Sequence, residues 1–150
     1  MEYVGKAGGG GDACIFCDAL AAGDDEARHI VHRTDTTFVM LNAFPYNTGH
    51  VMVASTRHVA ELSDLDPAER ADLMETTSRT IEVIRKAMEP DGFNTGMNLG
   101  KVAGAGIPGH LHTHVVPRWT GDTNFMPVTA DTKVLPELLQ DTAAKLRSAF

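Results

Sequence analysis

The chain has 150 residues, a formal net charge of −7 and a hydrophobic content of 43%, which together suit one globular domain with its own core. The negative charge argues against a nucleic-acid partner, because that affinity comes mainly from Lys and Arg contacts with phosphates. No apolar run approaches the ~20 residues of a membrane helix, and the chain does not start like a signal peptide. We therefore expect a cytoplasmic protein with no membrane partner.

The first residues differ in character from the rest of the chain. Residues 1–12 end in a run of glycines, Gly8 to Gly11, that buries no side chain and predicts a flexible tail. The single folded domain should occupy residues 13–150.

The first half of the domain has the pattern of strands. Residues 29–33 and 36–41 are short and rich in β-branched side chains, and two turn-forming residues separate them, which favours a hairpin. Residues 42–49 are dense in turn formers and lead to a third predicted strand at residues 50–55.

A long helix follows, because the apolar spacing changes to a helical period. Asp66, Pro67 and Glu69 have the order of an N-cap, a first helical position and a capping-box partner. The side chains expected on the buried face are Leu73, Thr77, Ile81, Ile84 and Met88.

Two more strands, residues 93–99 and 110–117, and a last helix from about residue 135 to 146 complete the predicted elements. Strands joined by hairpins around one long helix indicate an α+β fold rather than a parallel βαβ fold. We expect a five-stranded antiparallel sheet with one long central helix and a C-terminal helix.

The segment from His110 to Val116 carries three histidines at two-residue spacing. Side chains alternate between the faces of a strand, so His110, His112 and His114 should line one wall. Imidazole serves as nucleophile, acid, base or metal ligand, and the row therefore predicts a reaction site. The alternatives are a joint site for a catalytic metal and a solvated strand face.

A glycine-rich loop precedes this strand. Backbone N–H groups at Gly104, Gly106 and Gly109 would be able to approach a phosphate, or the glycines serve only the geometry of a tight turn. Asn98 either contacts the same anion or caps the loop.

Cys14 and Cys17 are the only cysteines, and their CxxC spacing supplies half of a tetrahedral zinc shell. A redox pair is the alternative, but the motif does not follow a strand in a βαβ pattern, which disfavours it.

The sequence HLHTHVV resembles the signature of the histidine triad (HIT) family of nucleotidyl hydrolases and transferases. The similarity extends to Asn42, to residues 49–53 and 93–100, and to VVPRWTGDTNF after the triad, which looks like the Fhit and diadenosine tetraphosphate phosphorylase branch. It covers about residues 14–148.

The resemblance implies a homodimer with a HIT-like fold that cleaves dinucleoside polyphosphates through a covalent nucleotidyl-histidine. His112 would be the nucleophile, the carbonyl of His110 would orient it, and His114 and His50 would line the phosphate pocket. Alternatives are an adenosine phosphoramidase of the Hint type and a purine-nucleotide-binding regulatory protein with incidental catalysis.

The resemblance also implies the ligand contacts. Asn42 would bind the ribose hydroxyls, and apolar side chains would enclose the base. The expected nucleotide-binding residues are Ile15, Phe16, Asn42, Phe44, Asn98, Gly104, Gly106, His112 and His114. Structural zinc would be held by Cys14, Cys17, His58 and His110, and any Mg²⁺ would enter with the substrate phosphates.

One departure from relatives concerns proton transfer. Relatives often carry Gln followed by Ser or Thr just before the triad, to contact phosphate and pass a proton to the leaving group. Residues 106–109 offer no side-chain donor here. Lys101 is a candidate substitute, and amine leaving groups should be handled less well.

Overall fold

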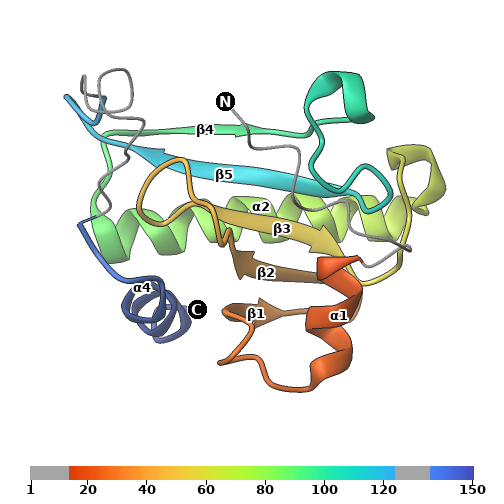
Figure 1. The fold of residues 1–150 in the computed structure, drawn as a ribbon, viewed down its shortest axis with the longest axis horizontal. Helices are drawn as coiled ribbons and strands as arrows, with labels where there is room; N and C mark the ends of the chain where they lie inside the picture. Colours follow the sequence, from red (N-terminus) through yellow and green to blue (C-terminus); the bar gives the residue numbers. More distant parts are fainter. Residues whose placement is uncertain (1–13, 124–135) are drawn as a thin grey trace.

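The computed structural model describes residues 14–123 and 136–150, and Figure 1 shows their arrangement. The elements in chain order are α1 (Ile15–Ala22), β1 (Ile30–Arg33), β2 (Thr37–Leu41), β3 (Val51–Ser55), the 3₁₀ turn η1 (Leu62–Asp64), α2 (Pro67–Met88), β4 (Gly92–Gly96), the 3₁₀ turn η2 (Lys101–Ala103), β5 (His112–Arg118) and α4 (Leu139–Arg147).

The five strands form one antiparallel sheet in the order β1-β2-β3-β5-β4. Helix α2 runs along one face, α1 lies on the other, and α4 packs beside β1 (Figure 1). The predicted α+β fold, with five antiparallel strands, a long helix and a C-terminal helix, is confirmed. No helix in the described part of the chain is both long and apolar enough to span a membrane.

Helix α2 begins where its capping sequence predicts. The side chain of Asp66 accepts from the Glu69 N–H at 2.9 Å, and Glu69 accepts from the Asp66 N–H at 2.9 Å, while Pro67 takes the first position. These bonds satisfy N–H groups that have no partner within the helix. The helix ends at Met88, and the next residue, Glu89, has a φ of 48°, outside the right-handed helical region.

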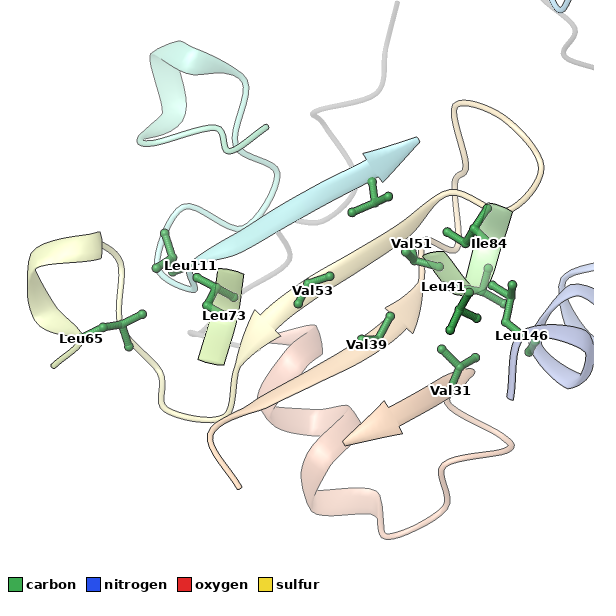
Figure 2. Close-up of a cluster of buried hydrophobic side chains, with 13 residues drawn as sticks. Val31, Val39, Leu41, Val51, Val53, Leu65, Leu73, Ile84, Leu111 and Leu146 are labelled. Atoms are coloured by element: carbon green, nitrogen blue, oxygen red, sulfur yellow. The ribbon is translucent and has the colours of Figure 1, made fainter. Parts of the chain in front are cut away.

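The apolar core lies between the sheet and α2 (Figure 2). Val39 and Val53 from adjacent strands face Leu73 and Ile84 of α2, and Leu146 of α4 closes one end. Ile81 and Met88, also predicted on the buried face, are partly buried against the same cluster. The opposite face of the sheet is thereby left for α1 and for the side chains of alternate residues on β5.

Helix α1 was not predicted. Phe16 and Ala19, one turn apart, are its buried residues, and Gly23 ends it with a φ of 67°. The helix covers the sheet face that carries Phe38, Met40 and other residues of a second buried cluster. It therefore places the CxxC motif on the same side of the sheet as the histidine row.

Several predicted strand boundaries are wrong. The first strand starts at Ile30 because His29 has a φ of 54°, and the fourth ends at Gly96 rather than Leu99. The fifth starts at His112, since the N–H of Leu111 donates to the Val59 carbonyl outside the sheet.

The last helix begins at Leu139 rather than near residue 135. Residue 135 itself, the predicted tail at residues 1–12 and the end of the VVPRWTGDTNF segment lie outside the described residues.

Candidate active site and metal centre

Strand β5 lies between β3 and the edge strand β4 and carries His112 and His114, while His110 comes two residues before the strand. His112 pairs with Ala54 of β3, and His114 pairs with Met52 of β3 on one side and Gly96 of β4 on the other. Small or flexible neighbours leave room for imidazoles on this face. His110 and His112 both contact the Phe16 ring, at 4.9 Å between ring centres, and His112 lies 5.0 Å from His114. The predicted wall of three imidazoles is present.

His112 is held in one orientation by its own strand. Its Nδ1 lies 2.7 Å from the carbonyl oxygen of His110, and a carbonyl only accepts, so Nδ1 carries the proton. Burial lowers the pKa of His112, which keeps the ring neutral. Its Nε2 therefore presents a lone pair, as a nucleophile requires.

A hydrogen-bond chain assigns the tautomers of His50 and His114. The N–H of Tyr46 donates to Nδ1 of His50 at 2.9 Å, so a neutral His50 carries its proton on Nε2. That Nε2 lies 2.9 Å from Nδ1 of His114 and donates to it. His114 therefore carries its own proton on Nε2 and is a hydrogen-bond donor there.

The environment of His114 makes stability depend on pH. Burial, reinforced by His112, lowers the pKa of His114 to about 4, whereas an unfolded histidine titrates near 6.5. Between these values the unfolded chain binds more protons, so the free energy of unfolding falls as the pH drops through this window.

We expect His114→Asn to flatten this dependence, because its amide oxygen still accepts from His50 but does not titrate. The loss of stability between pH 7 and pH 5 should be smaller in the variant by about 1–2 kcal/mol, measured by denaturant unfolding at both values. Equal losses of stability in the two proteins would contradict the lowered pKa of His114. Other titrating groups are common to both.

Two cysteines and two histidines, one of them His110 of the row, form a second cluster. Ligand atoms of Cys14, Cys17, His58 and His110 all lie within 4.8 Å of one another. Cys14 Sγ is 3.2 Å from Nδ1 of His110, and Cys17 Sγ is 3.3 Å from Nδ1 of His58. Sulfur and nitrogen ligands of one tetrahedral zinc are ~3.5 Å apart, given its bond lengths. The cluster thus has the donor set and spacing of a zinc site.

The surroundings of the cluster fit a metal. Nε2 of His110 donates to the Ser55 carbonyl at 2.7 Å, which leaves the Nδ1 lone pair directed to the sulfurs, as is usual for a metal-bound histidine. A side chain at Gly109 would come within 3.3 Å of His58 Nε2, so glycine leaves room for that ring. Both sulfurs face imidazole nitrogens, which favours a metal site over a redox pair.

The alternative interpretation of the row, a catalytic metal held jointly by the three histidines, is not supported. His110 faces the cysteines, and Nδ1 of His112 and of His114 bond to other groups. Within residues 14–123 and 136–150, the group of side chains placed to hold a metal is the cysteine–histidine cluster.

The glycine-rich loop between β4 and β5 bonds largely to itself. The N–H of Gly104 donates to the Lys101 carbonyl at 3.0 Å, with a φ of 87° that favours glycine. Asn98 donates its side-chain amide to the Gly104 carbonyl at 3.4 Å. Both residues therefore shape the loop. Of the predicted nest, Gly104 and Gly106 are exposed and Gly109 is partly buried.

The predicted base and ribose contacts differ in exposure. Ile15 on α1 is 45% exposed and Phe44 in the β2–β3 loop is 66% exposed, whereas Phe16 is fully buried beneath the histidines. Asn42 accepts from the Phe44 N–H at 2.9 Å through Oδ1, which bends the chain at the start of that loop.

Sequence reasoning missed the groups that orient the histidines. Tyr46 and Ser55 act through a backbone N–H and a backbone carbonyl, which leave no trace in residue type. Asn47 lies in a segment predicted only as a turn, although its side chain bonds across the fold to Asp122 at 2.8 Å. Gly109 was considered for an anion nest or a tight turn, and the room that it leaves for the His58 ring was not predicted.

The family model for the HIT domain matches residues 24–121 of this chain. The chain belongs to the HIT domain family. The match contains His50, the three histidines of the row and His58, whereas the two cysteines precede it.

Related proteins and structures agree with this assignment. A Mycobacterium tuberculosis protein named AP-4-A phosphorylase is 48% identical over 126 residues, which are 84% of this chain and 65% of that protein. The chain thus spans just under two thirds of that relative. The Schizosaccharomyces pombe asymmetrical bis(5'-nucleosyl)-tetraphosphatase is 34% identical over 62% of this chain and 50% of its own length.

A zinc-bound histidine triad family protein from Mycobacterium smegmatis superposes with a TM-score of 0.73, over 91% of this chain and 92% of that one. Its sequence identity is 24%, so the likeness establishes the shared fold.

Proposed function

We propose that this protein cleaves dinucleoside polyphosphates through a covalent nucleotidyl-His112 intermediate. The observation that carries the proposal is the hydrogen bond from Nδ1 of His112 to the His110 carbonyl, because it leaves the Nε2 lone pair free for attack. The phosphorylase and tetraphosphatase names of its HIT relatives support the substrate class.

In the first step, Nε2 of His112 attacks the α-phosphorus of the substrate. A P–N bond forms as the bond from phosphorus to the bridging oxygen breaks, and the leaving nucleotide takes the electron pair. The imidazole becomes positively charged, and the His110 carbonyl that accepts from Nδ1–H stabilises this charge. Attack on phosphorus by water or inorganic phosphate then releases a nucleoside monophosphate or diphosphate and restores His112.

His114 supplies the donor that residues 106–109 lack. Because His50 donates to its Nδ1, His114 presents an Nε2–H, which we assign to the oxygens of the scissile phosphate. A neutral imidazole stabilises a phosphate leaving group by hydrogen bonding, and an amine needs full protonation to leave. This assignment replaces the exposed Lys101 as the main candidate.

The nucleotide would lie on the exposed side of the row. We assign Ile15 and Phe44 to the base, with Phe16 beneath the histidines, and Nδ2 of Asn42 to the ribose hydroxyls. Gly106 is the proposed phosphate contact, while Asn98 and Gly104 hold its loop in shape. Any Mg²⁺ would be carried by substrate phosphates, since the described ligand cluster is made of sulfur and nitrogen.

Diadenosine tetraphosphate should be a better substrate than adenosine 5'-phosphoramidate, because a phosphate leaves as a weak base. We expect a kcat/KM at least about tenfold higher for the dinucleotide. Product analysis with and without inorganic phosphate identifies the acceptor: ADP and ATP indicate phosphorolysis, and AMP and ATP indicate hydrolysis.

A clear preference for the phosphoramidate would favour a phosphoramidase instead. Turnover of only a few molecules per hour on both substrates would favour a nucleotide-binding regulator.

We infer that the bound metal is zinc and that its role is structural. It would join three segments: the N-terminal end of α1 through Cys14 and Cys17, the chain after β3 through His58, and the residues just before β5 through His110. Those three segments are distant in sequence, and their cross-linking fixes the start of the strand that carries His112.

We further infer a homodimer that works in the cytoplasm. Strand β4 lies at the edge of the sheet with Asn94, Thr95 and Gly96 exposed, and an edge strand favours pairing with another chain. A CxxC motif used as a metal site suits a reducing compartment.

A further inference from the structure

The segment after the histidine row contains an aspartate that the proposed chemistry does not use. Asp122 lies in the turn after β5, and its side chain is 10% exposed. Oδ2 accepts from Arg118 Nε at 2.6 Å and from the Trp119 N–H at 3.1 Å, and Oδ1 accepts from Arg118 at 2.8 Å. The carboxylate is thereby fixed in place by its own turn.

The same carboxylate oxygen binds the loop between β2 and β3. Asn47 donates Nδ2 to Asp122 at 2.8 Å and to the Pro117 carbonyl at 3.2 Å, while its Oδ1 accepts from the Thr48 N–H at 3.1 Å. The Asn47 side chain thus joins the β2–β3 loop to the end of β5 and the turn that follows it.

Two hydrogen bonds join the β2–β3 loop to His50. The N–H of His50 donates to the Asn47 carbonyl at 3.1 Å, and the N–H of Tyr46 reaches back to Nδ1 of His50. Gly49 has a φ of 80°, which favours glycine, and a Cβ at this position would lie 2.8 Å from Met88 Sδ and 3.2 Å from Pro117 Cγ. Because Tyr46 lies in the same loop, the contacts of Asn47 and Gly49 also hold the Tyr46 N–H in place.

We propose that Asp122 is a positioning residue that acts through Asn47 and the β2–β3 loop to fix the tautomer of His50 and, through it, of His114. The hydrogen bond from Asn47 to Asp122 is the tether. Without it, the Tyr46 N–H no longer holds Nδ1 of His50 as an acceptor. His50 then populates both neutral tautomers, and Nδ1 of His114 loses its constant donor. The Nε2–H of His114, which the proposed function directs to phosphate, becomes intermittent.

The test uses two variants that remove the hydrogen bond between Asn47 and Asp122 from opposite ends, Asp122→Ala and Asn47→Ala. Asn47→Ala leaves the ion pair between Arg118 and Asp122 intact, so a shared effect belongs to the tether and not to that pair. The matched control is Asp91→Ala. Asp91 accepts from the Thr120 N–H in the same turn, at 2.6 Å, and the described structure gives its side chain no bond to the β2–β3 loop.

The first readout is nitrogen NMR of isotope-labelled histidine, which distinguishes protonated from unprotonated ring nitrogens without any substrate. The wild type and Asp91→Ala should show a single His50 tautomer with the proton on Nε2, and both tether variants should show a mixture. A pure wild-type tautomer in both tether variants would overturn the proposal.

The second readout is turnover and rests on the proposed function. In both tether variants kcat should fall about ten- to a hundredfold with KM changed less than about threefold, since a misplaced catalytic group affects the transition state more than binding. If kcat is unchanged in variants that show mixed His50 tautomers, the proposed effect of the tether on catalysis is overturned. If the wild type cleaves no dinucleotide, the proposed function fails, and the tautomer readout still decides the positioning role.

Discussion

Replacing His112 by Asn should reduce turnover of diadenosine tetraphosphate by at least about 10³-fold, the loss typical of removing a nucleophile. The amide of asparagine can still donate to the His110 carbonyl that now accepts from Nδ1, but it offers no nitrogen lone pair for attack on phosphorus. Nucleotide binding and the melting temperature should change little. Steady-state kinetics, nucleotide titration and thermal unfolding measure the three quantities.

His29→Asn is the matched control, because it makes the same substitution at a histidine outside the row. Its positive φ of 54° is a conformation that asparagine adopts readily, so the control should fold normally and keep wild-type turnover. Near-normal turnover in His112→Asn would exclude His112 as the nucleophile.

Replacing Cys17 by Ser should remove the metal and lower the melting temperature by about 10 °C. The cause is that a serine hydroxyl is a poor zinc ligand and the three segments joined by the cluster lose their cross-link. Metal content by elemental analysis and calorimetric unfolding test both parts. The expected wild-type content is one zinc per chain.

Several comparisons sharpen that test. His58→Asn should lose zinc, whereas His29→Asn should retain it, since His29 lies outside the cluster. A chelator should lower the melting temperature of the wild type towards that of Cys17→Ser and leave the variant unchanged. Full zinc occupancy in a Cys14→Ser, Cys17→Ser double variant would eliminate the site.

The elements with a strong local pattern were predictable from sequence. Strand alternation alone places His112 and His114 on one face, and the Asp66 to Glu69 capping box marks the start of α2. Both depend on residues close in the chain. The turn at residues 42–49 was predictable for the same reason, because turn chemistry is local.

Helix α1 was missed because it has only eight residues, with Phe16 and Ala19 as its buried contacts. That is too short for a helical period to stand out, so tertiary packing decides its structure.

The missed parts of the site are long-range. The hydrogen bond between Asn47 and Asp122 joins residues 75 positions apart, and nothing in the local sequence around either residue indicates the other as its partner. The donor to His50 is a backbone N–H, which every residue except proline possesses. The tautomers of His50 and His114 therefore follow from the fold, although the histidines themselves are evident in the sequence.

The identity of the covalent intermediate tests the proposed mechanism most directly. Diadenosine tetraphosphate labelled in its α-phosphates is mixed with the enzyme, quenched rapidly in alkali, and digested under conditions that preserve the P–N bond. Peptide fragmentation then separates His110, His112 and His114, which lie on one peptide. The mechanism predicts an adenylyl group on His112 that forms and decays at rates compatible with turnover. A label on His114 or His50, or turnover with no labelled histidine, would contradict it.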